Sequence, residues 1–173
     1  MSTIMCTKDL WRRMDGSGDL PDRPLPRAEA TKMGAWAAKA VPLPGRACCV
    51  ALNEITYLMV AFPLPHVSLF KVVFAYALWE ELEHIGVPAS VIEAELASFR
   101  EGATFAKNSN GSLLELLDDV SFHFAHRITR EGGIKPSALA TVQHRLNRMR
   151  HTCSDTSLPY KAALLLLSDE VRV

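Results

Sequence analysis

The sequence predicts an α+β domain in which a small antiparallel sheet of three to four short strands packs against several helices. Short runs of β-branched and apolar residues lie in the N-terminal part, whereas helical periodicity dominates the C-terminal half. The 173 residues are 49% hydrophobic and 22% charged, which is typical of one compact domain and excludes a disordered tail protein. We therefore expect a single domain over residues 1–173, with its helices on one face of the sheet.

The N-terminal quarter is expected to hold one strand and two helices. Residues 2–7 form a β-rich run, and apolar residues at helical spacing follow over 8–14. Glycines, prolines and alternating charges make 15–27 an irregular and mobile loop. The alanine-rich segment 28–41 then predicts a helix, which ends at the break that begins with Pro42.

A hairpin and a long apolar helix follow. Residues 46–52 and 56–62 are rich in Val, Cys, Leu and Tyr, and the short linker between them is typical of an antiparallel hairpin at the centre of the sheet. Ser68 can cap a helix that runs to residue 84 or 85, with Gly86 as its stop signal. Apolar residues surround its first half, so we expect it to be buried on all sides. They are Leu69, Phe70, Val72, Val73, Phe74, Tyr76, Leu78 and Trp79.

Capping boxes predict where the next two helices begin. Ser90 with Glu93 opens one helix, and Ser112 with Glu115 opens another. The expected elements of this half are helices over 90–99, 112–131, 136–149 and 159–170 and a short strand over 104–107.

The four cysteines have the spacing neither of a zinc ribbon nor of a small disulfide scaffold. They are Cys6, Cys48, Cys49 and Cys153. Cys48 and Cys49 are adjacent in an apolar run, so on a strand they point to opposite faces and are expected to be buried.

The N-terminus carries Lys8 and Asp9 where a signal peptide needs an apolar core. The apolar stretch 55–79 is interrupted by two prolines, a histidine and Lys71, so we expect a strand and a buried helix rather than a membrane span. These features predict a cytoplasmic protein with no membrane partner.

Charge is segregated along the chain although the formal net charge is zero. Residues 80–119 are strongly acidic, and residues 127–151 form a basic block in which Glu131 is the one acid. Clustered arginines on a helix can neutralise a phosphate backbone, so this block is a candidate nucleic-acid or partner surface. The alternative is that the block pairs with the acidic segment, faces a second subunit or is solvated. The candidate residues are Arg127, Arg130, His144, Arg145, Arg148 and Arg150.

Asp119, His123 and His126 lie on one face of the predicted helix over 112–131, away from its core stripe. Their spacing would let them converge on a metal ion only if a second element shaped the site. Phe122 makes this outer face partly apolar, so a partner surface or packing against the C-terminal helices is the alternative.

The loop before that helix is a candidate anion site. Lys107, Asn108, Asn110 and Ser112 combine a cation with small polar side chains at a positive helix end. The glycines and Lys-Ser/Thr pair of a Walker loop are missing, and ordinary capping by Asn110 or Ser112 accounts for the same residues.

Three parts of the chain carry one further pattern. The first is the opening Cys6-Thr7-Lys8-Asp9-Leu10. The second is Gly34-Ala35-Trp36 with Arg46 and the turn from Asn53 to Thr56. The third runs from Phe105 through Ser112 to Asp119. Together they resemble an uncharacterised bacterial family of small proteins, some plasmid-borne, built on a domain of unknown function. The family often has Arg at the position of Gly111 and Asn at that of Lys39. The resemblance implies no activity and adds weight to the loop from Lys107 to Ser112.

These features predict a non-catalytic cytosolic binding protein with a protein or nucleic-acid partner, in a bacterial mobile-element or defence locus. No catalytic signature such as a Gly-x-Ser-x-Gly elbow is present, and no cofactor is expected. The partner is expected to be another protein or a second copy of the chain, with nucleic acid as the option for residues 127–151. The alternative is an enzyme acting on a phosphorylated or nucleic-acid substrate, with Asp119, His123 or His126 moving protons or holding a metal.

Overall fold

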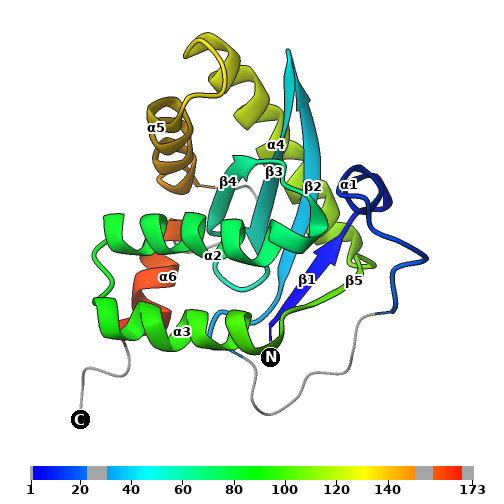
Figure 1. Cartoon of the computed structure of the whole chain (residues 1–173). Coiled ribbons are helices and arrows are strands. Elements are labelled where there is room, and N and C mark those ends of the chain that lie inside the picture. Colours follow the sequence, from blue (N-terminus) through cyan, green and yellow to red (C-terminus); the bar gives the residue numbers. More distant parts are fainter. Residues whose placement is uncertain (1, 23–30, 151–157, 169–173) are drawn as a thin grey trace.

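The computed structural model, which describes residues 2–22, 31–150 and 158–168, is an α+β structure built around one mixed sheet of five strands (Figure 1). The strands lie in the order β4-β3-β2-β1-β5. β1 is parallel to both of its neighbours, and the other pairs are antiparallel. The sheet is therefore not the purely antiparallel one that the sequence predicts. The strands are β1 (Thr3–Cys6), β2 (Trp36–Leu43), β3 (Arg46–Asn53), β4 (Met59–Pro63) and β5 (Thr104–Lys107).

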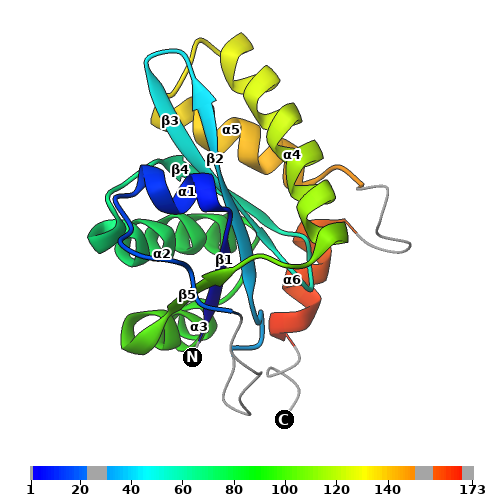
Figure 2. The ribbon, with the colours of Figure 1, turned by 90° about the vertical axis from the view of Figure 1, so that its right-hand side faces the viewer.

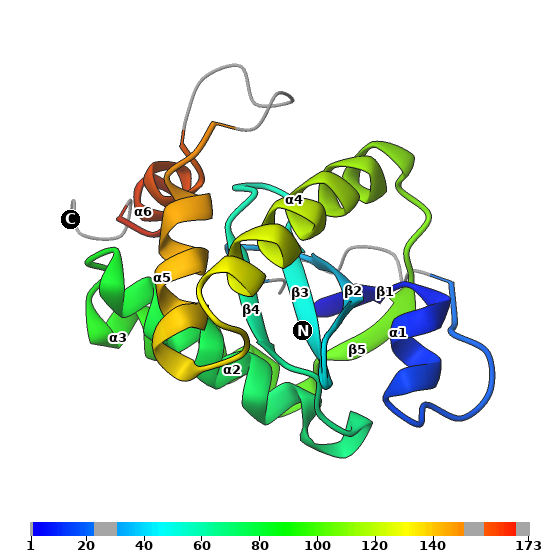
Figure 3. The ribbon, with the colours of Figure 1, turned by 90° about the horizontal axis from the view of Figure 1, so that it is seen from above.

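Helices cover both faces of the sheet, which corrects the prediction that they share one face (Figure 2). One core is built with side chains of α1, α2, α3 and α6, and the other with side chains of α4 and α5. Seen from above, α4 crosses the sheet on the side opposite α2 (Figure 3). The helices are α1 (Lys8–Arg13), α2 (Val67–His84), α3 (Ala89–Gly102), α4 (Gly111–Arg130), α5 (Pro136–Asn147) and α6 (Pro159–Ser168).

β2 is the one strand of the sheet that the sequence did not predict. It stands where a helix was expected over 28–41, and residues 28–30 lie outside the described part. Alanine favours helices in isolation, but a strand buried on both faces needs small side chains, and tertiary context overrides propensity. Trp36, Ala38 and Ala40 face the α2 side, while Ala37 and Val41 face α4 and α5.

The other predicted strands and the short first helix are confirmed. β1 leads into α1, whose N-cap Thr7 accepts a hydrogen bond from the backbone N–H of Leu10. Cys49 and Cys48 enter opposite cores, as their adjacency predicts, and Cys153 lies outside the described residues. Of the predicted loop over 15–27, residues 15–22 form no helix or strand and the rest is outside the described part.

The structure confirms one predicted cap and corrects two. α4 is capped by Asn110, one of the two residues that the sequence offered, and α2 by the side chain of His66 rather than Ser68. α3 begins after Pro88 and has no side-chain cap hydrogen bond, so the predicted box of Ser90 and Glu93 does not cap it.

α2 is not buried on all sides. Phe70, Phe74 and Leu78 pack in the core, but Leu69, Val72 and Tyr76 are 56%, 68% and 64% exposed. The expectation was wrong because α2 lies at the surface of the molecule, between α3 and α5 (Figure 1). Among the described residues, no helix has the length and apolar character that a membrane crossing requires.

Candidate functional site: the outer surface of α2 and its pocket

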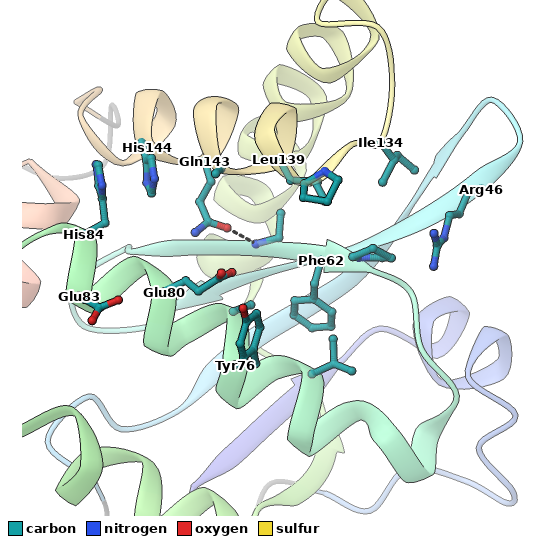
Figure 4. Close-up of a pocket in the computed structure, with 16 residues that line it drawn as sticks. Arg46, Phe62, Tyr76, Glu80, Glu83, His84, Ile134, Leu139, Gln143 and His144 are labelled. Atoms are coloured by element: carbon teal, nitrogen blue, oxygen red, sulfur yellow. Dashed lines mark hydrogen bonds between the residues drawn. The ribbon is translucent and has the colours of Figure 1, made fainter. Parts of the chain in front are cut away.

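A pocket of about 590 Å³ lies between α2 and α5, over the edge strand β4 (Figure 4). Its floor is apolar, and its rim carries ionisable side chains of both signs. An apolar cavity with a few polar groups is the usual form of a binding site. The apolar lining includes Ala61, Phe62, Pro63, Val73, Ala77 and Leu139, and the polar lining includes Arg46, Tyr76, Glu80, Glu83, His84, Gln143 and His144.

Two amides of α5 close the free edge of β4 beside this pocket. The Asn147 Oδ1 accepts the backbone N–H of Met59 at 2.7 Å, and its Nδ2 donates to the Met59 carbonyl at 2.9 Å. The Gln143 Oε1 accepts the N–H of Ala61 at 2.7 Å. The next outward position is Pro63, which has no N–H to satisfy. The edge is therefore covered by side chains, and no further strand is needed there.

A buried carboxylate holds these amides in place. Glu81 of α2 is fully buried and accepts hydrogen bonds from the Gln143 Nε2 at 2.6 Å, the His144 Nδ1 at 2.7 Å and the Asn147 Nδ2 at 2.7 Å. Burial alone would raise its pKa, but the bonds from His144, Gln143 and Asn147 outweigh burial and lower the pKa of Glu81 below its ordinary value. Glu81 is thus an ionised anchor that joins α2 to α5.

Two histidines stack at one end of the pocket. The rings of His84 and His144 lie parallel within 9°, with centroids 3.4 Å apart. Burial and the nearby His144 lower the pKa of His84, and Glu81 offsets this only in part. Because Glu81 binds the Nδ1 of His144, the Nε2 is the nitrogen left for a ligand or a proton.

Charge is separated along the pocket, as Figure 4 shows. Arg46, at the start of β3, lies at one end, and Glu80 and Glu83 of α2 lie toward the other. Tyr76 stands between them, and its hydrogen bond to Glu80 raises the pKa of the phenol. The pocket is therefore basic at the N-terminal end of α2 and acidic at the C-terminal end.

A second hollow, the α2–α3 groove, lies on the other side of the exposed residues. It measures about 430 Å³ and is lined mainly by apolar groups, among them Val72, Ala75, Trp79 and Leu96. Tyr76 lines both hollows. We call Leu69, Val72 and Tyr76 the α2 ridge, because they stand between the α2–α5 pocket and the α2–α3 groove.

Of the predicted anion-site residues, Lys107 lies at the carboxyl ends of β1 and β5. Lys107 ends β5 opposite Cys6 of β1, and it shares a hollow of about 300 Å³ with Lys8 and Arg12. Asp19 and Asp22 line the same hollow and reduce its positive charge.

Among the remaining residues of that loop, Asn110 caps α4. The Asn108 Oδ1 accepts the N–H of Asn110, and the Asn110 Oδ1 accepts that of Leu113. Ser112 lies in the first turn and is exposed. The capping interpretation thus accounts for Asn110, and anion binding stays a prediction. Lys39, where the resembling family has Asn, forms an ion pair with Asp118 of α4.

Two of the three predicted metal ligands lie together. The Asp119 Oδ1 is 3.6 Å from the His123 Nε2, and His126 is exposed one turn further on. Within the part of the chain that the structure describes, no group of three or more His, Cys, Asp or Glu residues is arranged to hold a metal. Metal binding on this face stays a prediction.

Several members of the predicted basic surface have partners within the molecule. Arg145 pairs with Glu131 at 2.9 Å, and the Arg127 Nη2 lies 3.4 Å from the Met149 sulfur. Arg148 lies over the ring of Tyr160, 5.7 Å from its centroid. His144 is held by Glu81 as described, while Arg130 and Arg150 are exposed. Of these contacts, that of His144 with Glu81 is the pairing with the acidic segment that the sequence offered as an alternative.

Sequence reasoning missed the α2 surface and the Glu81 cluster. The signal for the cluster was Gln143 and Asn147, two amides four residues apart on a helix face that is otherwise apolar. Glu81 is one of three glutamates near the end of α2, so the sequence marks it only as one charge of an acidic segment.

Comparison with known proteins gives a family but no activity. A search of curated proteins found no match. A family model described as "Domain of unknown function (DUF6933)" matches residues 3–162, which span the whole sheet and every helix except the end of α6. The chain belongs to this family of domains of unknown function, DUF6933.

Proposed function

We propose that this protein is a non-catalytic binding protein whose partner is another protein, engaged through the α2 ridge and the hollows beside it. The observation that carries the proposal is the exposure of Leu69, Val72 and Tyr76, each more than half exposed, on one face of one helix. Apolar residues exposed singly are normal, but a contiguous apolar patch with a polar rim is typical of a protein interaction site.

The shape of the surface supports the same proposal. Tyr76 projects between two hollows, and an aromatic residue beside a pocket is the usual anchor of a protein interface. Burial of the part of each ridge side chain that is exposed in the single chain would contribute about 1 to 2 kcal/mol before the costs of association.

Charge favours a protein over nucleic acid at this surface. Glu80 and Glu83 border the ridge and would repel a phosphate backbone. Nucleic-acid binding by the basic block is a separate option, which fluorescence anisotropy of labelled RNA and DNA at two salt concentrations tests. Binding that weakens with salt and is lost on changing Arg145 and Arg148 to Glu would favour nucleic acid as the partner.

Site-specific photocrosslinking tests the proposal. A benzophenone amino acid in place of Tyr76 is expected to give adducts with protein in the native host, whereas the same probe in place of Leu165 serves as the matched control. Leu165 is 66% exposed on α6, so the two positions are equally accessible to chance collisions. Equal adduct yield at both positions would contradict the proposal.

A second candidate function is acid–base catalysis on a small molecule in the α2–α5 pocket. The hydrogen bond from the His144 Nδ1 to Glu81 favours it, because a carboxylate that holds one ring nitrogen orients the other to accept a proton. Assays of the purified protein on phosphate and carboxylic esters test it, with His144→Gln expected to abolish turnover. Loss in His123→Gln instead would point to the α4 face predicted from the sequence, and no turnover at all would remove this candidate.

A further inference from the structure

We infer that the partner of the α2 ridge is a second copy of this chain, packed with its α2 antiparallel to the first. This inference rests on the proposed function, since it names the protein that occupies the same surface. Most soluble oligomers are symmetric pairs in which one surface contacts itself, so the test of the inference is whether the α2 surface is self-complementary.

The apolar part of the α2 surface is self-complementary. Leu69, Val72 and Tyr76 are three and four residues apart, which is the spacing of a helix seam that packs against another helix. A two-fold axis that passes between Val72 and Tyr76 places Val72 of each copy against Tyr76 of the other. The same operation sets Leu69 of one copy opposite Trp79 of the other, so the apolar contact continues to both ends of the seam.

The shape of the α2 surface is self-complementary as well. Each copy presents the ridge as a projection and has a hollow on each side of it, of about 590 Å³ toward α5 and about 430 Å³ toward α3. Because the two-fold axis keeps the lateral position of each helix, the α2–α5 pockets of the two copies face each other, and Tyr76, which borders both hollows, extends from its own copy toward a hollow of the other. Projections that enter hollows are how helices pack at native density.

The charged residues along the pocket favour antiparallel packing of the two copies. Arg46 lies at the N-terminal end of the α2–α5 pocket, and Glu80 and Glu83 lie toward the C-terminal end (Figure 4). In the antiparallel arrangement, Arg46 of each copy lies beside Glu80 and Glu83 of the other. A parallel arrangement would instead set like charges together, and opposed helix dipoles also favour the antiparallel one.

Sedimentation velocity of the purified full chain tests the inference. The wild-type protein is expected to sediment as a dimer that dissociates on dilution. Tyr76→Glu is expected to raise the dissociation constant at least about tenfold, which corresponds to 1.4 kcal/mol, while Leu165→Glu leaves it unchanged. Thermal unfolding of each variant shows that the fold is retained.

Charge reversal tests the direction of packing. Arg46→Glu alone and the pair Glu80→Arg with Glu83→Arg are each expected to weaken the dimer, and the three changes together to restore it. A monomer at every concentration, or a dimer insensitive to Tyr76→Glu, overturns the inference. So does a dimer that Tyr76→Glu disrupts but the combined reversal does not restore, because the packing direction is then wrong.

The two proposals fail separately. If the purified chain is a monomer and the probe at position 76 nevertheless links a different protein, the α2 ridge is a binding surface with another partner, and only this inference falls. If the probe links nothing above the Leu165 control and the chain is a monomer, both fall.

Discussion

Asn53 shows how much one buried side chain can organise. It ends β3, is fully buried, and donates from its Nδ2 to the carbonyl of Met33 at 2.6 Å. Its Oδ1 accepts the backbone N–H groups of Ile55 and Thr56 at 3.1 and 2.9 Å and the Thr56 hydroxyl at 2.9 Å. One amide thus shapes the turn between β3 and β4 and ties it to the segment that enters β2.

Replacement of this amide is expected to be costly. Asn53→Ala leaves buried donors and acceptors without partners, and we expect a loss of about 2 to 3 kcal/mol in the free energy of unfolding, measured by urea denaturation. Asn110→Ala removes an exposed capping asparagine and is expected to cost about 1 kcal/mol. Equal losses in the two variants would show that burial of Asn53 contributes nothing extra.

At the scale of elements, the edge of β4 depends on α5. Asn147→Leu would leave the N–H of Met59 unpaired and remove one of the three donors to Glu81. We expect faster hydrogen exchange at the amides of Met59 and Ala61 and a loss of about 2 to 4 kcal/mol in stability. Ser137→Leu, at an exposed position of the same helix, is the control. Unchanged exchange at Met59 in Asn147→Leu would contradict this account of the edge.

β2 is the element where alanine has a packing role rather than a helical one. Ala37 is fully buried on the side of the sheet that α4 covers, so Ala37→Leu would push the helix away from the strand. We expect a loss of about 1 to 3 kcal/mol in stability by thermal or urea unfolding. Ala94→Leu, exposed on α3, is expected to change stability by less than about 0.5 kcal/mol.

β2 also marks the limit of what sequence reasoning could reach. Local patterns predicted β1, the β3–β4 hairpin, β5 and the long helices, because each carries its own periodicity or stop signal. They did not predict β2, whose alanines are small to suit two covered faces. The parallel pairing of β1 with β2 and β5 was missed for a related reason, since pairing depends on contacts far apart in the chain.

The candidate site residues likewise fall into those that local sequence could predict and those that it could not. The residues of the anion loop are adjacent in sequence, so reasoning from the chain found them, and the structure adds Lys8 and Arg12 beside Lys107. The Glu81 cluster joins residues that are 62 to 66 positions apart, and no local pattern links them. The exposure of the α2 ridge likewise follows from where the neighbouring helices lie.

The whole molecule is expected to lose stability as the pH falls. The folded pKa of His84 is below its ordinary value of 6.5, so its contribution is present above pH 6.5 and is lost as the pH falls through the folded pKa. The folded pKa of Glu81 is below 4.5, so its contribution is lost only in more acidic solution. Burial raises the pKa of Glu95, which acts in the opposite sense.

Urea unfolding over a pH series separates these groups. His84→Phe keeps a ring against His144, and we expect it to flatten the decline that begins near pH 6.5. Glu81→Gln is expected to flatten the decline below pH 4.5 while lowering stability at neutral pH. A decline near pH 6.5 that persists unchanged in His84→Phe would assign it to another group.

Cys48 and Cys49 give this molecule a natural pair of reporters. They are neighbours in the chain, yet each is fully buried in a different core, and burial raises the pKa of both thiols, that of Cys48 to about 11. A thiol reagent therefore reaches either one only when its own layer of helices lifts from the sheet. Two variants, one that retains Cys48 without Cys49 and one that retains Cys49 without Cys48, allow the labelling rates of the two thiols to be compared. Equal rates would mean that both helix layers open in a single cooperative event. Faster labelling of Cys48 would mean that α4 and α5 open while the rest stays closed, so a single β-strand would divide the protein into two units of unfolding.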